Sequence, residues 1–411
     1  MRIAVLGAGV SGLAAAFHLS GRAQVTVFEA GPRAGGNIRT EELDGCRVEW
    51  GPNGFLDNEP ATLRLATALG IENRLVPARP EAALRFVFRA GRLRELPRTP
   101  KGFLRSDCLS LRGRLRVLLE PLVRRGPETD RSVLEFARRR LGREAARVLV
   151  DAFVTGIYAG DPARLSLRSA LPRLHALERE HGSLLRGAKA RGFGPPGTLT
   201  SFDEGMEVLV RALAARVDLR VGFPASEVDR GAFDRVVCTL PAPRAAGLFD
   251  GELAALLARV PTAPVAVVAL VLREPLEVPD AFGFLAPRSE GLRVLGVLYD
   301  SSIFPGRAPE GARLFRAMLG GRRDPEAVAL DDGALVETVA RDLRRAWGAF
   351  PEPRAVRVIR HPVGIPQYEI GHAELLDAIE RARPPWLRLT GSSYRGVSVN
   401  ACVQEALDLA P

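Results

Sequence analysis

The first forty residues follow a hydrophobic pattern that predicts strand, turn, helix and strand in that order. Arg2 to Leu6 is a short apolar run, which predicts a buried parallel strand, and Gln24 to Phe28 predicts a second one. Between them a glycine-rich turn leads into a predicted helix from Leu13 to Leu19. This order indicates an α/β unit built on a parallel sheet.

The pattern changes several times along the remaining chain. From about residue 97 to 195 it is helical, with Leu and Val at helical spacing and Arg between them. Later apolar runs predict a second, mostly antiparallel sheet. The predicted helices cover residues 60–70, 111–125, 132–154, 208–217, 335–347 and 373–382, the predicted strands cover 84–88, 92–96, 234–243, 265–272, 292–298 and 313–319, and residues 387–407 predict a strand, a glycine loop and a helix.

The turn after the first strand carries the glycine spacing of a dinucleotide site. Gly7 permits a tight turn, Gly9 lets a pyrophosphate approach the backbone, and Gly12 lets the helix pack on the strand. The helix start offers unpaired N–H groups to phosphates. Glu29, at the end of the second strand, can accept hydrogen bonds from a ribose. An accidental glycine turn is the alternative, and it does not explain why all these parts occur in order.

A second glycine loop favours FAD over NAD as the dinucleotide. Residues 31–36, Gly-Pro-Arg-Ala-Gly-Gly, form a flexible and partly basic segment just after Glu29. The segment resembles a loop of the flavin oxidoreductases, a superfamily that includes amine oxidases and phytoene desaturases, where it lies along the FAD pyrophosphate and ribitol. An ordinary surface loop is the alternative, because Arg and Gly are abundant in this chain.

Composition limits the choices without selecting a reaction. The 411 residues exceed one ordinary domain, so two or three structural units are expected. The net charge of +10 comes almost entirely from Arg, since Lys101 and Lys189 are the only lysines. Codon bias of a GC-rich genome explains this composition as well as an anionic partner does. We predict no nucleic-acid partner.

Cysteines and histidines predict neither disulfides nor a metal site. The four cysteines are widely spaced and suit buried thiols in a reducing compartment, and the five histidines form no ligand cluster. No signal peptide is recognised, and the longest later apolar run, Val265 to Leu272, is too short to span a bilayer. We expect a cytoplasmic protein or one that lies on the inner face of a membrane.

Four separated stretches resemble one family of flavoproteins. They are GPNGF at 51–55, TGIYAG at 155–160, IPQYEIGH at 365–372 and GSSYRGVSVN at 391–400. Together they resemble the protoporphyrinogen oxidases, FAD- and oxygen-dependent enzymes of haem synthesis, and the bacterial members in particular. The resemblance runs in consistent order along nearly the whole chain.

The resemblance implies three parts. They are a Rossmann-like FAD-binding domain of the amine-oxidase type, a substrate-binding domain with an antiparallel sheet, and a helical membrane-binding insertion. In that insertion, Arg beside Leu and Phe suits anionic headgroups, although solvated helix faces are the commoner explanation of the pattern alone. The implied location is the cytoplasm, with peripheral attachment to the inner face of the cell membrane. The FAD-binding domain takes residues 1–73, 197–252 and 377–411, the substrate-binding domain 74–96 and 253–376, and the insertion 97–196.

The implied cofactor site joins both ends of the chain. It combines the two glycine loops, a segment after residue 50 and the loop before the last helix, whose N–H groups can stabilise negative charge on reduced flavin. Relatives carry a longer hairpin where this chain has only residues 221–233, so the adenine contact is placed at Ala225. The cofactor-binding residues are Gly7, Gly9, Val10, Ser11, Gly12, Glu29, Ala30, Arg33, Gly35, Gly36, Asn37, Gly51, Pro52, Asn53, Ala225, Gly391, Ser392, Val397, Ser398 and Val399.

The implied substrate pocket holds an apolar macrocycle bearing propionates. Arg85 matches an Arg that pairs with a propionate, since a guanidinium fork suits a carboxylate. Asn53 matches a position near the flavin, where it could orient a pyrrole N–H, and these two are the candidate catalytic residues. Without the resemblance, the sequence would indicate that Arg85 is one more solvated arginine and that Asn53 is a turn residue. His361 stands where some relatives carry Trp. Further substrate-binding residues are Phe153, Gly156, Phe282, Leu285, Leu298 and Met318.

The implied reaction is the six-electron oxidation of protoporphyrinogen IX to protoporphyrin IX, with O2 as acceptor and H2O2 as product. Coproporphyrinogen III, with four propionates instead of two, is the alternative substrate, and a single matched Arg together with the GIPQY pattern favours the first. An amine oxidase often holds a Lys near the flavin, and both lysines here lie in the helical insertion. A catalytically silent FAD-binding scaffold is a third alternative. A second copy of the chain and haem-pathway enzymes are candidate partners.

Overall fold

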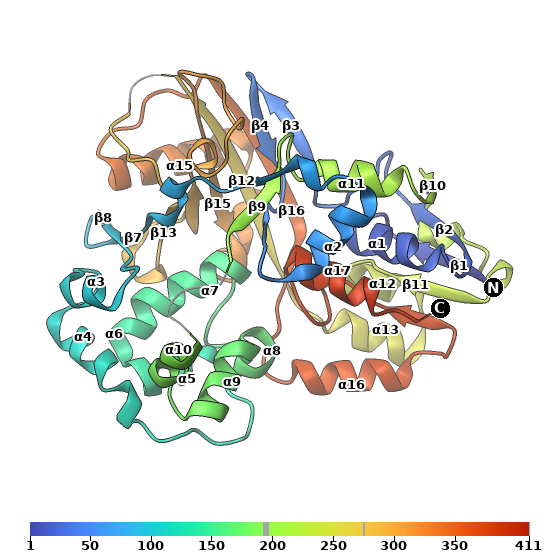
Figure 1. The fold of residues 1–411 in the computed structure, drawn as a ribbon, viewed down its shortest axis with the longest axis horizontal. Helices are drawn as coiled ribbons and strands as arrows, with labels where there is room; N and C mark the ends of the chain where they lie inside the picture. Colours follow the sequence, from blue (N-terminus) through green and yellow to red (C-terminus); the bar gives the residue numbers. More distant parts are fainter. Residues whose placement is uncertain (192–196, 274–275, 411) are drawn as a thin grey trace.

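Two large β-sheets organise the molecule, and the computed structural model describes residues 1–191, 197–273 and 276–410 (Figure 1). The first sheet has five parallel strands in the order β10-β2-β1-β11-β17, so its strands come from both ends and from the middle of the chain. Parallel neighbouring strands need crossover connections, and the other elements of the molecule lie within these connecting segments. The strands are β1 (Arg2–Leu6), β2 (Gln24–Glu29), β10 (Asp218–Val221), β11 (Arg235–Cys238) and β17 (Leu387–Leu389).

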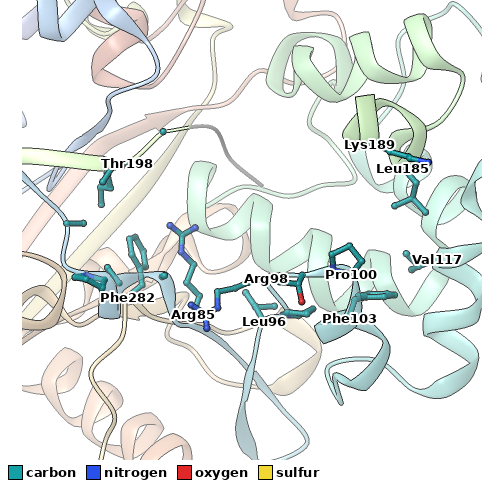
Figure 2. A pocket seen from close by; sticks show the side chains of 18 of the residues that line it. Arg85, Leu96, Arg98, Pro100, Phe103, Val117, Leu185, Lys189, Thr198 and Phe282 are labelled. Carbon is teal, nitrogen blue, oxygen red and sulfur yellow. The ribbon is translucent and has the colours of Figure 1, made fainter. Parts of the chain in front are cut away.

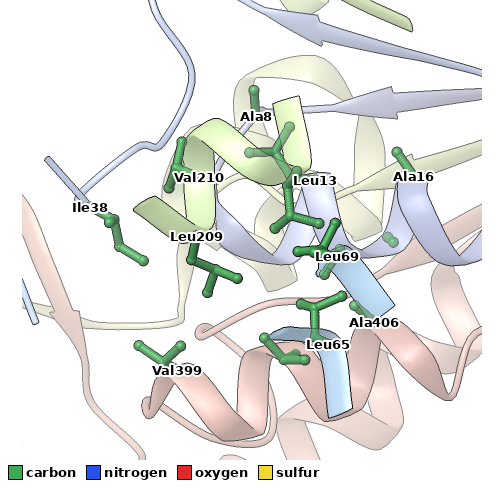
Figure 3. Close-up of a cluster of buried hydrophobic side chains, with 14 of the residues drawn as sticks. Ala8, Leu13, Ala16, Ile38, Leu65, Leu69, Leu209, Val210, Val399 and Ala406 are labelled. Carbon is green, nitrogen blue, oxygen red and sulfur yellow. The ribbon is translucent and has the colours of Figure 1, made fainter. Parts of the chain in front are cut away.

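Helices cover both faces of this sheet, as a parallel sheet requires. On one face, α1 buries Leu13 and three successive alanines, whose small side chains allow close packing against α17 (Figure 3). The predicted strand–turn–helix–strand order is confirmed. This face carries α1 (Val10–Leu19), α2 (Pro60–Leu69), α11 (Glu207–Ala214) and α17 (Val399–Leu407), and the other carries α12 (Ala242–Ala245), α13 (Gly251–Ala258) and α16 (His372–Ala382).

The second sheet has seven strands in the order β16-β12-β15-β14-β13-β7-β8. All neighbours are antiparallel except β13 and β7, so the prediction of a mostly antiparallel sheet is confirmed. Its core packs against α15 (Asp332–Trp347). The strands are β7 (Arg85–Arg89), β8 (Arg92–Glu95), β12 (Thr262–Leu272), β13 (Gly283–Leu285), β14 (Gly296–Leu298), β15 (Arg313–Gly320) and β16 (Ala355–Pro366).

The predicted strand at 292–298 is a strand only in β14. Side chains satisfy the backbone before it: Arg323 donates to the carbonyl oxygens of Leu292 and Val294, and Asp342 accepts the N–H groups of Arg293 and Val294. A backbone satisfied by side chains does not need a neighbouring strand. The smaller elements here are α14 (Asp300–Ile303), the hairpin β3 (Thr40–Leu43) and β4 (Cys46–Glu49), and the sheet of β5 (Phe55–Leu56), β9 (Leu199–Phe202) and β6 (Leu75–Pro77).

A group of helices lies below the second sheet, at the lower left of Figure 1. The predicted long helices over 111–125 and 132–154 are wrong in their length. The first ends at Leu118, before Pro121, and the second is interrupted at Gly142, whose φ is +91°. The helices are α3 (Pro100–Arg105), α4 (Leu111–Leu118), α5 (Val133–Leu141), α6 (Arg143–Ala145), α7 (Asp151–Tyr158), α8 (Leu167–Ala170), α9 (Pro172–His181) and α10 (Leu184–Arg191).

A buried charge network holds these helices together. The fully buried Arg140 lies 3.0 Å from Glu120 and 2.8 Å from Glu178, and Glu178 also pairs with Arg131 and Arg139. Part of the Arg content of this region is therefore structural. No helix in the described ranges is long and apolar enough to cross a membrane. The predicted end of the insertion at residue 196 lies outside the described residues, and the predicted boundaries of the three parts stay a prediction.

Candidate functional site

The first glycine turn forms a cradle for an anion at the start of α1. A Cβ at Gly12 would lie 1.9 Å from the carbonyl oxygen of Gly7, so no larger residue fits there. A Cβ at Gly9 would meet nothing within 4 Å, which leaves open space above the turn. Gly9 is also the N-cap of α1, and no side chain accepts from the first N–H groups of the helix. These donors and this space fit a pyrophosphate.

The second glycine loop lies directly against the first. Gly35 donates its N–H to the carbonyl oxygen of Ala8 at 2.7 Å, and a Cβ at Gly36 would lie 3.4 Å from the Cα of Gly9. Glu29 joins the two loops, because its carboxylate accepts the N–H of Ala8 at 2.9 Å and that of Gly31 at 2.8 Å. Each carboxylate oxygen keeps a second lone pair with which it can accept a ribose hydroxyl.

The side chain of Arg33 stabilises the loop to which it belongs. Its guanidinium donates to the carbonyl oxygens of Ala34 and Gly36 and lies 3.6 Å from Glu207 on α11. The side chain therefore fixes the path of the loop that Ala30 and Asn37 flank. Its predicted contact with the cofactor stays a prediction.

The loop between β17 and α17 completes the same site from the far end of the chain. A Cβ at Gly391 would lie 3.4 Å from the Oγ of Ser11, so the first and last glycine loops touch. Tyr368 fixes this loop by donating to the carbonyl oxygen of Ser392 at 2.5 Å. Ser398 caps α17 by accepting the N–H of Ala401. The two ends of the predicted cofactor site are thus brought together, with Val397 and Val399 on either side of the cap.

The segment from Gly51 to Asn53 lies beside the second glycine loop. A Cβ at Gly51 would lie 2.4 Å from the carbonyl oxygen of Asn37, so only glycine allows this contact. Pro52 follows, and then the amide of Asn53, whose Nδ2 is buried without a hydrogen-bond partner. A buried donor without a partner is costly, and a bound ligand would satisfy it. The segment therefore fits the ring end of a dinucleotide whose phosphates lie on α1.

A cavity of about 1000 Å³ lies between the β7–β8 hairpin and helices α3, α4 and α10 (Figure 2). Its walls are mainly apolar and include Leu96, Phe103 and Val117. Among the described residues that line it there are five cations and no carboxylate. The cations are Arg79, Arg85, Arg98, Arg186 and Lys189.

Arg85 and Phe282 stand together on one wall of this cavity (Figure 2). The Arg85 guanidinium lies 4.4 Å from the centre of the Phe282 ring, and within the described part of the chain no carboxylate pairs with it. The Arg85 side chain remains exposed to solvent, and partial desolvation by the surrounding atoms lowers its pKa below the ordinary value. An unpaired cation in an apolar wall favours an anionic ligand.

The other predicted pocket residues lie outside the lining of this cavity. A Cβ at Gly156 would lie 3.1 Å from the side chain of Leu285, so these two are in contact. Leu298 packs in the same small apolar cluster as Phe282. Phe153 is exposed. The residues that are predicted for the site but are not among those lining the cavity are Asn53, Phe153, Gly156, Leu285, Leu298 and Met318. The substrate contacts of these residues stay predictions.

Two further predicted positions have defined surroundings. The ring of His361 on β16 donates from Nε2 to the carbonyl oxygen of Trp50 at 2.8 Å, and burial lowers its pKa, so the ring is neutral at pH 7. Ala225 lines a separate cavity of about 600 Å³ with Leu6 and Trp386. The four cations besides Arg85 were missed, because nothing in the sequence distinguishes them from the other arginines and the second lysine.

The glycine loops, the free helix start and the apolar cavity fit a dinucleotide-dependent flavoprotein oxidoreductase. Residues 10–410 match the family model described as flavin containing amine oxidoreductase. The chain belongs to that family and, within it, to the protoporphyrinogen oxidases. The predicted cofactor, FAD, and the predicted enzyme class follow from this membership.

Named relatives cover nearly the whole chain. It is 32% identical to the chloroplastic protoporphyrinogen oxidase of Nicotiana tabacum, over 99% of this chain and 84% of that protein. It is 29% identical to the coproporphyrinogen III oxidase of Bacillus subtilis, over 98% and 96%. A crystal structure from Exiguobacterium sp. 255-15, provisionally described as a protoporphyrinogen oxidase, superposes with a TM-score of 0.87 at 26% identity, over 99% and 97%.

Proposed function

We propose that the protein oxidises protoporphyrinogen IX to protoporphyrin IX, with O2 as the electron acceptor. The observation that carries the proposal is the apolar cavity with the unpaired Arg85 in its wall. A porphyrinogen is an apolar macrocycle with carboxylates on its edge, so it matches both features of the cavity. The names of the curated relatives support the same substrate class.

The residues of the chain act mainly by positioning. When bound, FAD supplies the hydride acceptor and passes electrons to O2. The N–H groups at the start of α1 hold the phosphates, and Glu29 accepts from the ribose. Arg85 pairs with a propionate, while Phe282 and Leu96 hold the ring and exclude water. The Oδ1 of Asn53 accepts a pyrrole N–H and so orients the macrocycle, while its Nδ2, which has no partner among the described residues, can donate to an oxygen of a bound ligand.

Coproporphyrinogen III is a second candidate substrate, and the five cations that line the cavity favour it. Arg98 already lies 3.8 Å from the carboxylate of Glu95, so a dicarboxylate can pair with two of the other four cations, whereas a tetracarboxylate can pair with all four. Comparing kcat/KM for the two porphyrinogens separates the candidates. A preference for the tetracarboxylate would replace protoporphyrinogen IX in the proposal and leave the reaction unchanged.

Peripheral docking on the inner face of the cell membrane is part of the proposal. Leu111, Leu115 and Leu118 on α4 are 65%, 51% and 43% exposed, and their spacing places them on one helix face. Leu118 also lines the cavity, so an apolar surface lies beside its mouth. An apolar stripe flanked by arginines suits an anionic lipid surface. Leu104, Leu119 and Leu122 extend the exposed surface.

The test is an assay of the purified protein with reduced porphyrinogens. We expect a flavin absorption spectrum that bleaches anaerobically on adding protoporphyrinogen IX, and porphyrin fluorescence in air. Arg85→Ala is expected to raise KM roughly tenfold or more, from the loss of a charged hydrogen bond, and the control Arg64→Ala, exposed on α2, should have no effect. A flavin that no porphyrinogen bleaches would contradict the proposal and favour the silent scaffold.

A further inference from the structure

Arg316 on β15 reaches across from the second sheet to the segment that carries Asn53. The Arg316 side chain is fully buried, and its Nη1 donates to the carbonyl oxygen of Glu49 at 2.7 Å and to that of Gly51 at 3.0 Å. Its Nε and Nη2 donate to the two carboxylate oxygens of Asp300 at 2.7 and 2.8 Å. All three nitrogens of the guanidinium thus have fixed acceptors. Two of the four acceptor atoms are the backbone carbonyl oxygens of Glu49 and Gly51.

A second buried ion pair holds the same segment from its other side. Arg307 lies 3.0 Å from the carboxylate of Glu49 and donates to the Oγ of Ser201 at 2.7 Å. Glu49 also accepts the N–H of Met206 at 2.8 Å. Both the side chain and the carbonyl group of Glu49 are therefore fixed, and the four charges of the two pairs cancel.

This network connects the substrate side of the molecule to the cofactor side. Side chains two apart on a strand share a face, so Arg316 lies on the same face of β15 as Met318. Leu298 stands opposite Arg316 in the register of β14 and β15. Asn53 follows only two residues after the carbonyl group of Gly51. A shift of the second sheet would therefore move the segment that presents the Asn53 amide.

Stability alone does not account for the network. Replacing a buried ion pair by apolar residues of similar volume is often neutral or stabilising, because the desolvation of both charges is avoided. Donors aimed at backbone carbonyl groups instead define where a segment lies. Gly51 is also packed against Asn37 with no room for a Cβ, so the segment has little freedom on that side.

We propose that the Arg316–Asp300 pair is a positioning unit, which sets the place of the Asn53 amide through the carbonyl groups of Glu49 and Gly51. The inference rests on the proposed function, because it assigns the unit to the porphyrinogen site. Arg316 and Asp300 touch neither substrate nor cofactor in this arrangement. Their effect on the reaction passes through Asn53.

The test combines a double variant that removes both charges of the Arg316–Asp300 pair with a variant that removes the Asn53 amide. Arg316→Met with Asp300→Leu removes the unit without leaving an unpaired buried charge. We expect this variant to fold, to keep FAD and to keep KM within about twofold, while kcat falls about tenfold. Asn53→Ala alone should lower kcat by a similar factor. Added to the double variant, Asn53→Ala should lower kcat less than about threefold further, because the amide is already misplaced.

Two controls separate positioning from a structural role. Arg293→Gln with Asp324→Asn removes another ion pair on the same side, 2.8 Å long, that does not touch the segment, and its effect should multiply with that of Asn53→Ala. Hydrogen–deuterium exchange should quicken over residues 49–54 in the Arg316 double variant and stay unchanged in the control. Arg316→Lys, which keeps the charge but has one nitrogen, should resemble the double variant in kcat.

The outcomes distinguish this inference from the proposed function. A wild-type protein that oxidises no porphyrinogen overturns the proposed function, whatever the variants do. An active wild type in which the losses of the Arg316 double variant and Asn53→Ala multiply overturns the positioning unit. A double variant that unfolds or loses FAD also overturns it, because the pair would then be needed for the fold.

Discussion

Gly9 and Gly12 stand three residues apart in one turn, and the structure separates what each does. At Gly12 a side chain would strike the backbone of Gly7, whereas at Gly9 it would enter open space. Gly12 is thus required by the protein itself, whereas the space above Gly9 fits the predicted pyrophosphate. Both were recognised from their spacing alone, because a backbone turn depends on local sequence.

These two glycines give a prediction at the scale of single residues. Gly9→Ala is expected to leave the free energy of unfolding of the apoprotein within about 0.5 kcal/mol of wild type while weakening FAD binding. Gly12→Ala is expected to destabilise the apoprotein by roughly 1–3 kcal/mol through overpacking. Urea unfolding and FAD titration measure the two effects. Wild-type FAD affinity in Gly9→Ala would contradict the prediction.

Single residues of the substrate cavity were harder to predict. Arg85 and Phe282 were predicted, and both line the cavity, but Arg79, Arg98 and Lys189 were missed. Their shared position arises from hairpin and helix segments that meet only in the folded chain. The same limit applies to Arg316, whose two backbone acceptors, Glu49 and Gly51, lie more than 260 residues away in sequence.

At the scale of elements, the sequence predicted the kind of element better than its length. The order of strands and helices around β1 is confirmed, because short, continuously apolar runs predict buried parallel strands and the glycine turn marks the start of the helix between them. The helices after residue 110 were predicted too long, since Leu and Arg keep a helical period across Pro121 and Gly142. Backbone conformation ended these helices where the hydrophobic pattern did not.

The exposed face of α4 gives a prediction at this scale. Leu115→Asp with Leu119→Asp is expected to lower binding to vesicles of mixed neutral and anionic phospholipid at least tenfold, since burial of each Leu contributes about 1.5–3 kcal/mol. Val221→Asp, which replaces an exposed apolar residue of β10 on the other side of the molecule, is the matched control. Co-sedimentation with vesicles measures the binding. Equal loss in both variants would argue against docking through α4.

At the scale of the whole molecule, two histidines join distant parts. His361 ties β16 to the carbonyl group of Trp50, and His372 ties α16 to that of Tyr394 at 2.9 Å. Burial lowers the pKa of both from the ordinary 6.5, so the folded protein keeps them neutral. The unfolded chain then binds more protons than the folded one as the pH falls below about 6.5.

Stability should therefore be complete above about pH 6.5 and decrease on acidification. Each histidine contributes a slope of at most about 1.4 kcal/mol per pH unit. Urea unfolding between pH 7.5 and 5.5 measures the slope, and His361→Gln and His372→Gln should each make it shallower. A slope that neither substitution changes would assign the acid sensitivity to other groups.

The strand order of the first sheet has a consequence for how the protein is made. β1 is synthesised well before its neighbour but one, β17, and before the helix α17 that packs on α1. Until they arrive, the apolar face of α1 lacks Val399, Val403 and Ala406. The complete cofactor site therefore forms only after α17 has been synthesised, and nascent chains that stall before residue 387 should expose this face and be bound by chaperones.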